Sequence, residues 1–187
     1  YVGIAPSAPN TLGVSENVGL VWDREKIVTA QIVEVMPHPN ADRLVLADVD
    51  YGASEPHRVV TGAPNILYLK GQGRLTNGPK VIFAMEGAQL YDGHAEGRKT
   101  MTLKGAKIRG VYSNAMACSE KELGISDEHE GIIILDDDAP IGVPLQDYMG
   151  DMVLDIEILP NGARCQSIIG VAREVAALTG ATFKGQG

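Results

Sequence analysis

The chain has 187 residues, 44% of them hydrophobic, and a formal net charge of −8 at pH 7. This size allows a real core in one large or two small domains, whereas the acidic balance argues against a strong, autonomous RNA binder, because phosphate contacts supply much of the affinity in such complexes. No stretch approaches the roughly 20 apolar residues that span a bilayer, and the first residues lack the basic region of a signal peptide. We therefore expect a cytoplasmic protein without membrane contact. Because it lacks an initiator Met and stops just past a predicted helix, we also expect a piece of a longer polypeptide.

Runs of β-branched and aliphatic residues, separated by turn residues, predict a mainly β fold. The expected strands are Ile27 to Val35, Leu44 to Val49, Arg58 to Thr61, Lys80 to Met85, and a last one made of Met101 to Leu103 with Ala106 to Val111. Such short strands with irregular connections fit an OB barrel, a partly open Greek-key barrel whose strand surface and loops bind oligonucleotides. The periodicity alone also allows other small barrels.

Two connections carry readable turn chemistry. In the run from His38 to Leu44, Pro39 fixes its own φ, and Asn40 and Asp42 can bond nearby backbone, which predicts an ordered turn between strands. Taken alone, this run indicates a turn rather than a binding site. Residues 65 to 80 are rich in Gly and predict a flexible surface loop. No nucleotide site is predicted there, because the Gly-x-x-x-x-Gly-Lys-Ser/Thr pattern is absent.

The second half of the chain predicts two helices and one strand. Ser119 and Glu122 form a capping box closed by Gly124, which explains Ser119 and Glu120 better than RNA contact does. The run Met152 to Ile158 alternates apolar and acidic residues and predicts a strand with one buried face. Apolar residues then recur at helical spacing from the cap Ser167 to the stop Gly180.

The cysteines and histidines give no metal signal. Cys118 and Cys165 form no ligand pair by spacing, and no histidine lies at a short metal-binding interval from them. We therefore predict no metal site, and we interpret both cysteines as small buried apolar groups.

Several blocks together resemble a known family. They are His38-Pro39-Asn40-Ala41-Asp42-Arg43-Leu44, Gly62-Ala63-Pro64-Asn65, Lys107-Ile108-Arg109-Gly110-Val111, Ser113-Asn114-Ala115-Met116-Ala117-Cys118-Ser119-Glu120 and Glu122-Leu123-Gly124. In this order they resemble the tRNA-binding OB domain near the start of the bacterial phenylalanyl-tRNA synthetase β subunit, which also occurs in a few other RNA-binding proteins. The flank Asp151 to Gly180 favours the β subunit, because a free-standing tRNA-binding protein is not expected to carry it.

The resemblance implies a mixed, mainly β architecture. An OB-fold tRNA-binding domain over residues 27–149 would be inserted in a small, discontinuous α+β domain made of residues 1–26 and 150–187. The β subunit of the family is several times longer than this chain. It works with an α subunit as a phenylalanine-tRNA ligase in protein biosynthesis.

Candidate RNA-binding residues follow from what RNA recognition needs, namely cations for phosphates and stacking or polar groups for exposed bases. Five cations and no acid occur between Arg98 and Arg109, so one face could be locally basic. The candidates are the cations Arg43, Lys104, Lys107 and Arg109, the apolar contacts Tyr112 and Met116, and the polar groups Asn40, Asn65, Ser113 and Asn114. An aromatic content of 5% argues against a broad stacking platform for single strands.

The sequence departs from the family pattern at two places. Tyr112 and Asn114 stand where acids are usual, and Ala115 stands where Gly is usual, so the geometry of this loop can differ. After Pro160-Asn161, the run Gly162-Ala163-Arg164-Cys165 replaces the usual Arg-Pro-Asp-Cys.

The chain offers no candidate catalytic residues. Ser119 has no recognisable His or Asp partners, and no ATP-binding motif of a synthetase is present. The resemblance assigns ATP and phenylalanine to the partner α subunit, so ATP and Mg are expected only for the full synthetase, with no cofactor in this segment. Two hypotheses remain: a module that binds and positions tRNA, or a structural module that supports synthetase assembly with little RNA contact.

Overall fold

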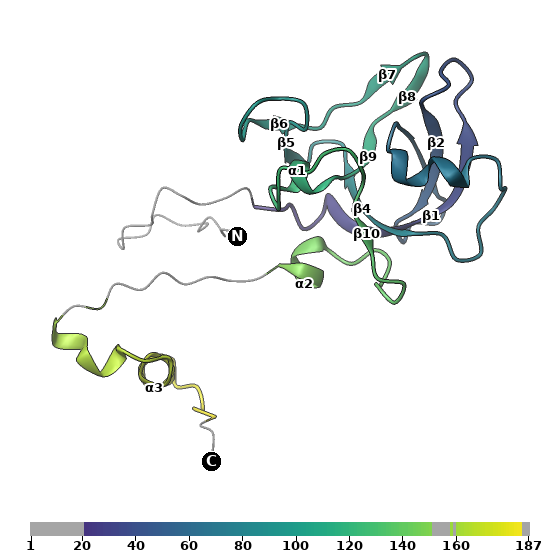
Figure 1. The fold of residues 1–187 in the computed structure, drawn as a ribbon. Coiled ribbons are helices and arrows are strands. Elements are labelled where there is room, and N and C mark those ends of the chain that lie inside the picture. The colour runs from purple at the N-terminus through teal and green to yellow at the C-terminus, as the bar shows by residue number, and fades with distance from the viewer. Residues whose placement is uncertain (1–20, 151–157, 159, 185–187) are drawn as a thin grey trace. The chain divides into compact units, whose positions relative to one another are not determined.

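The computed structural model of the chain describes residues 21–150, 158 and 160–184. The chain divides into two compact units near residue 153, which are described separately below (Figure 1). Among the described residues, no helix is both long enough and apolar enough to cross a membrane. The first unit is mainly β, and the second contains the longest helix.

The strands of the first unit are short. They are β1 (Ile27–Pro37), β2 (Val45–Asp50), β3 (His57–Thr61), β4 (Lys80–Met85), β5 (Gln89–Tyr91), β6 (Thr100–Thr102), β7 (Ala106–Ile108), β8 (Val111–Ser113), β9 (Ala115–Ala117) and β10 (Ile134–Leu135). The helices of the chain are η1 (Pro64–Leu69), α1 (Glu120–Leu123), α2 (Leu145–Met149), η2 (Pro160–Cys165) and α3 (Ile168–Thr179).

An antiparallel sheet in the order β10-β4-β1-β2-β3 forms the body of the first unit, and β9 also pairs with β4. The partners of β4 explain the curvature of this sheet: β1 lies along one edge, while β9 and β10 take successive parts of the other. The register between β1 and β2 shifts between Ile32 and Glu34. Such a bulge bends a long strand, which lets one strand serve two parts of a barrel.

Side chains complete the contact between β3 and the β8–β9 segment. The Ser113 hydroxyl accepts a hydrogen bond from the Val60 amide at 3.2 Å and donates to the Ala115 carbonyl at 3.1 Å. The sheet therefore curls from β3 through β2, β1 and β4 to β9 and nearly closes on itself (Figure 1). This is the expected OB-type barrel, mainly β with few helices.

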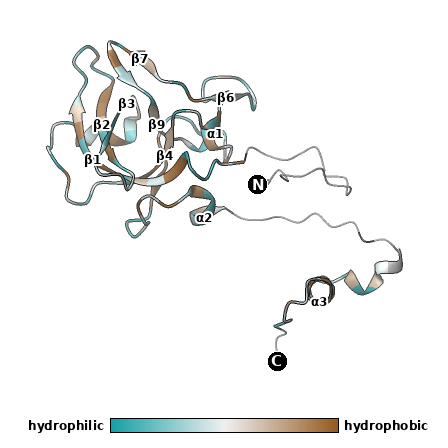
Figure 2. Ribbon diagram, turned by 180° about the vertical axis from the view of Figure 1, so that it is seen from behind, coloured by the Kyte–Doolittle hydropathy of each residue, from teal (hydrophilic) through white to brown (hydrophobic). Residues whose placement is uncertain are grey.

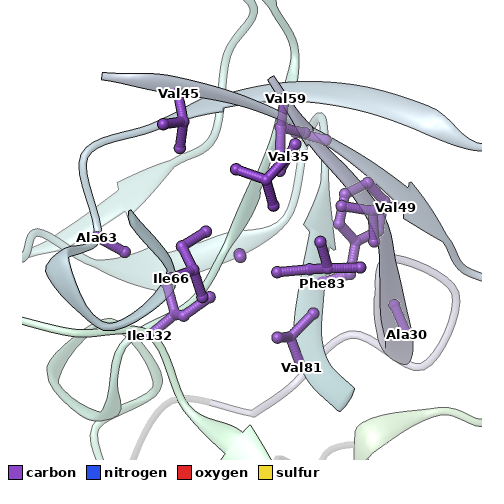
Figure 3. Packing of buried hydrophobic residues seen from close by; sticks show 14 of the residues in the cluster. Ala30, Val35, Val45, Val49, Val59, Ala63, Ile66, Val81, Phe83 and Ile132 are labelled. Carbon is purple, nitrogen blue, oxygen red and sulfur yellow. The ribbon is translucent and has the colours of Figure 1, made fainter. Parts of the chain in front are cut away.

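Two apolar clusters stabilise the barrel. The first fills the interior, where Phe83, Val35, Val45 and Ile66 are almost wholly buried (Figure 3). The second lies on the outer face of β1 and β4 and includes Ile27, together with the non-strand residues Trp22, Leu123 and Leu145. Successive side chains of a strand point to opposite faces, so Val81 and Phe83 enter the first cluster while Ile82 and Ala84 enter the second. Burial on both faces explains the unbroken apolar run of β4, which Figure 2 shows in brown.

Residues before β1 pack with the barrel unit. Trp22 is 4% exposed, and its indole N–H donates to the Leu123 carbonyl at 3.0 Å. Gln146 in α2 donates to the Trp22 carbonyl, and Arg24 forms a two-bond ion pair with Asp147 at 2.6 and 2.7 Å. The discontinuous domain of residues 1–26 and 150–187 stays a prediction, because residues 1–20 and the expected strand at 152–157 lie outside the described residues.

Local predictions were confirmed where the signal was local. Ser119 caps α1 with both bonds of the capping box, and Gly124 ends the helix with φ 75°. Two expectations were wrong. Residues 65–80 are not a simple loop, because η1 buries Ile66 and Leu69, and the Gly71 and Leu75 amides donate to β1. The single strand expected at 106–111 is split into β7 and β8.

The second unit contains η2 and α3. Ser167 caps α3 as predicted, accepting a bond from the Gly170 amide, and Gly180 ends it with φ 72°. Hydrogen bonding within the Arg164–Glu174 ion pair lowers the pKa of Glu174 and raises the pKa of Arg164. Figure 2 shows α3 largely in the brown of apolar residues.

The two cysteines differ in environment. Cys118 is fully buried, and burial raises the pKa of its thiol well above the ordinary value. Cys165 is only half-buried, so the prediction that both are buried was right for Cys118 alone.

Candidate nucleic-acid interface

The hairpin of β7 and β8 forms the centre of the candidate interface. Lys107 pairs with Tyr112, and Ala106 pairs with Ser113. Directly paired residues share a face of a two-stranded ribbon, and neighbouring pairs alternate between its two faces. Because Ser113 is buried against β3, Lys107 and Tyr112 lie on the opposite, exposed face, where Tyr112 is 55% exposed. A cation and an aromatic ring are therefore neighbours on the outer face.

Arg109 and Gly110 form the tight turn of this hairpin. Their φ angles are 49° and 95°, both in the left-handed region, as a type I′ turn requires. Among the described residues, Arg109 is the only one other than glycine with a positive φ. Asn, Asp or Gly usually occupies such a position, because a side chain in left-handed geometry meets a steric penalty. The turn thus holds an exposed arginine at its tip at a conformational cost.

The loop between β1 and β2 is fastened to this turn. The Asn40 side-chain amide donates to the Arg109 carbonyl at 3.0 Å, and the His38 ring nitrogen Nε2 lies 3.2 Å from the Ile108 carbonyl. His38 is 6% exposed, and its Nδ1 lies 3.1 Å from the Asn40 backbone amide. Figure 1 shows the loop and the hairpin side by side at one end of the barrel. The most recognisable sequence motif is therefore one wall of the candidate interface.

The candidate cations differ from the paired ones. Arg43, Lys104, Lys107 and Arg109 are exposed, and none of them forms an ion pair with another described residue. Arg58, by contrast, bonds Asp48 at 2.7 Å, and this hydrogen bond raises the pKa of the guanidinium. Charges without an internal partner are the ones available to phosphate groups.

A polar network lies beside the hairpin. Asn114 connects His57 to the carboxylate of Glu86, at 2.8 and 3.4 Å. Glu86 also accepts a bond from the Gly105 amide at 3.2 Å, next to Lys104. A Cβ at Gly105 would lie 2.1 Å from the Tyr112 hydroxyl, so the tyrosine lies directly over this glycine. The interface therefore includes one acid, which the sequence did not single out.

Other candidates have internal partners. Ser113 is buried and holds β3 to β8, as described above. The Asn65 side chain donates to the Ile132 carbonyl at 2.7 Å and accepts from the Ile132 amide at 3.3 Å, which holds that segment against η1. Met116 packs against the second apolar cluster.

The structure thus brings together only part of the predicted site. Lys107, Arg109 and Tyr112 lie on the hairpin with Asn40 bound to its turn, while Lys104 precedes β7 and Arg43 lies farther along the β1–β2 connection. Sequence reasoning missed the contacts of His38, His57 and Glu86 with this region. Their partners are far away in the sequence, and no local spacing signals such pairs.

Catalytic or metal chemistry has no visible support in this region. Within the described ranges, no group of three or more His, Cys, Asp or Glu side chains is placed to hold a metal ion.

The barrel and its basic hairpin define the class of an OB-type nucleic-acid-binding domain. A family model described as "Putative tRNA binding domain" matches residues 27–144, which include the whole barrel. The chain belongs to this family of tRNA-binding domains.

Curated relatives are β subunits of one synthetase. Phenylalanine–tRNA ligase β subunits are 51% identical in Dehalococcoides mccartyi, 45% in Cupriavidus pinatubonensis and 41% in Coxiella burnetii. The matches cover 81%, 85% and 86% of this chain, but only 17% to 18% of the relatives. Among solved structures, the MetRS related protein from Pyrococcus horikoshii aligns with a TM-score of 0.40 and 18% identity over 64% of this chain and 88% of that chain, a likeness that carries no argument.

Proposed function

We propose that this chain is a non-catalytic module that binds and positions tRNA within a phenylalanine–tRNA ligase β subunit. The observation that carries the proposal is the β7–β8 hairpin, where exposed Lys107 and Arg109 have no internal ion-pair partner and adjoin Tyr112. Cations serve phosphates and an exposed ring serves an unstacked base, which are the two requirements of RNA binding by such domains. The family match and the relatives support tRNA as the RNA.

Titration of the chain with tRNA tests this proposal. The net charge of −8 opposes binding, while the local cations favour it, so we expect weak binding with dissociation on the order of micromolar or poorer at physiological salt. Affinity should rise as salt is lowered, because fewer counterions then compete for the phosphates. Absence of binding even at low salt would favour the alternative, a structural module for synthetase assembly.

The longer protein extends the proposal. We infer from the relatives that it acts with a synthetase α subunit, in the cytoplasm, and that ATP and Mg²⁺ are used outside this segment. The absence of a metal-holding cluster among the described residues is compatible with that assignment.

The substitution Arg109→Asn separates stability from binding. Asparagine tolerates left-handed geometry, and Asn-Gly is the preferred pair of a type I′ turn, so the free energy of unfolding should increase by about 0.5–1 kcal/mol. Binding of tRNA should nevertheless weaken, because the tip loses its charge. Denaturant unfolding and tRNA titration measure the two effects.

The control for this substitution is Arg109→Lys. It keeps the charge and should keep most of the affinity, without the gain in stability. Full tRNA affinity in Arg109→Asn would show that the arginine is not at the interface.

A further inference from the structure

We infer that His38 and Asn40 are positioning residues that hold the β7–β8 hairpin in its RNA-binding geometry. This inference rests on the proposed function and adds residues that need not touch RNA themselves. Their two bonds reach consecutive carbonyls, Ile108 and Arg109, at the end of β7 and the start of the turn. We call this pair of contacts the hairpin clip.

The bonding pattern of His38 assigns its protons. The Asn40 amide must donate to Nδ1, because a backbone nitrogen has no free electron pair to accept a bond. Nδ1 is therefore unprotonated, and Nε2 carries the proton that it donates to the Ile108 carbonyl. A buried, neutral imidazole of this kind is a fixed bridge between the loop and the hairpin. The same His38 ring also orients the backbone of Asn40, whose side chain makes the second contact.

The hairpin needs such support. Each of its strands has three residues, and an isolated two-stranded hairpin is marginally stable at best in water. Its turn also carries Arg109 in left-handed geometry. The Ser113 contact with β3 fixes the far end of β8, while the clip fixes the turn that carries the cation.

Close packing at the turn reinforces this arrangement. A Cβ at Gly110 would lie 3.3 Å from the Asn40 amide nitrogen, so the loop leaves little room for the turn to move toward it. Ordering side chains and loops during association costs affinity, and a surface held in its bound geometry avoids part of that cost. The clip should thus strengthen tRNA binding without contributing a charge.

The test compares two short substitutions with two controls in the full chain. The double variant His38→Asn/Asn40→Ala loses both contacts, because an asparagine amide reaches only as far as Nδ1 and cannot reach the Ile108 carbonyl. His38→Gln places an amide nitrogen about as far out as Nε2, so it can still donate to that carbonyl. Asn77→Ala is the control for loss of an exposed asparagine elsewhere.

Two readouts are measured on each variant. Hydrogen exchange without RNA should show faster exchange of the amides of residues 106–113 in the double variant, while exchange in β1, β2 and β4 stays slow. Titration with tRNA should show about fivefold weaker binding for the double variant, as expected when a binding element must be ordered on association. His38→Gln and Asn77→Ala should keep both properties close to those of the unchanged chain.

The outcomes separate the clip from the proposed function. Unchanged exchange in the hairpin, or unchanged affinity despite faster exchange, would overturn the positioning role. Loss of slow exchange throughout the barrel would also overturn it, since His38 and Asn40 would then support the whole fold. Failure of the unchanged chain to bind tRNA would overturn the proposed function, and the exchange data would still decide whether the clip orders the hairpin.

Discussion

Replacing Lys104, Lys107 and Arg109 together by alanine is expected to weaken tRNA binding on the order of 10- to 100-fold at low salt. These side chains are exposed, and within the described part of the chain they form no ion pairs, so their charges are available to phosphates. Each phosphate contact that is lost removes released counterions, so the slope of log affinity against log salt should fall by about one per contact. Titrations at several salt concentrations measure both effects.

A matched control removes the same charge elsewhere. Lys70, Arg74 and Lys80 belong to the segment around the end of η1 and the start of β4, outside the hairpin. Replacing them by alanine lowers the net charge equally and should change affinity much less. Equal losses in the two variants would mean that tRNA responds to overall charge rather than to the hairpin, and no loss in either would favour the structural module.

The triple substitution should leave the fold intact. Surface substitutions of this kind usually change the free energy of unfolding by no more than about 0.5 kcal/mol. A comparable thermal transition for the variant and the unchanged chain is therefore the check that weaker binding reflects lost contacts.

Local sequence signals predicted the elements that depend on neighbours in the chain. The capping box of Ser119 and Glu122 needs only residues three apart, and the strand at Lys80–Met85 needs only an apolar run, so both were predictable. The turn at Arg109 was missed because arginine is not a residue that signals left-handed geometry. There the clip supplies tertiary support that no local pattern contains.

The same distinction applies to the candidate site. The cations were predictable, because charged side chains on short strands and loops are usually exposed. The role of Ser113 was not, since its partner Val60 belongs to another strand of the barrel. Asn65 likewise acts through Ile132, on the other side of the chain's turn into β10. A polar residue in a family motif can thus be a structural contact as readily as a binding contact.

The largest loss of stability is expected from Trp22→Ala. The ring is 4% exposed in the second apolar cluster, and truncation of a buried tryptophan costs about 3–5 kcal/mol through lost burial and the cavity left behind. The Leu123 carbonyl also loses the indole N–H donor at the end of α1. Urea unfolding followed by far-ultraviolet circular dichroism is the suitable measurement, because the substitution removes the only tryptophan of the chain.

Two further variants identify the source of that loss. Trp22→Phe keeps most of the apolar contact but not the hydrogen bond, so it should cost about 1–2 kcal/mol. Tyr68→Ala truncates an aromatic side chain that is 69% exposed and should cost no more than about 0.5 kcal/mol. A loss below about 1 kcal/mol for Trp22→Ala would contradict packing against the barrel. It would instead favour a separate domain for residues 1–26, as first predicted from the sequence, because a residue outside the barrel core could be truncated without opening that core.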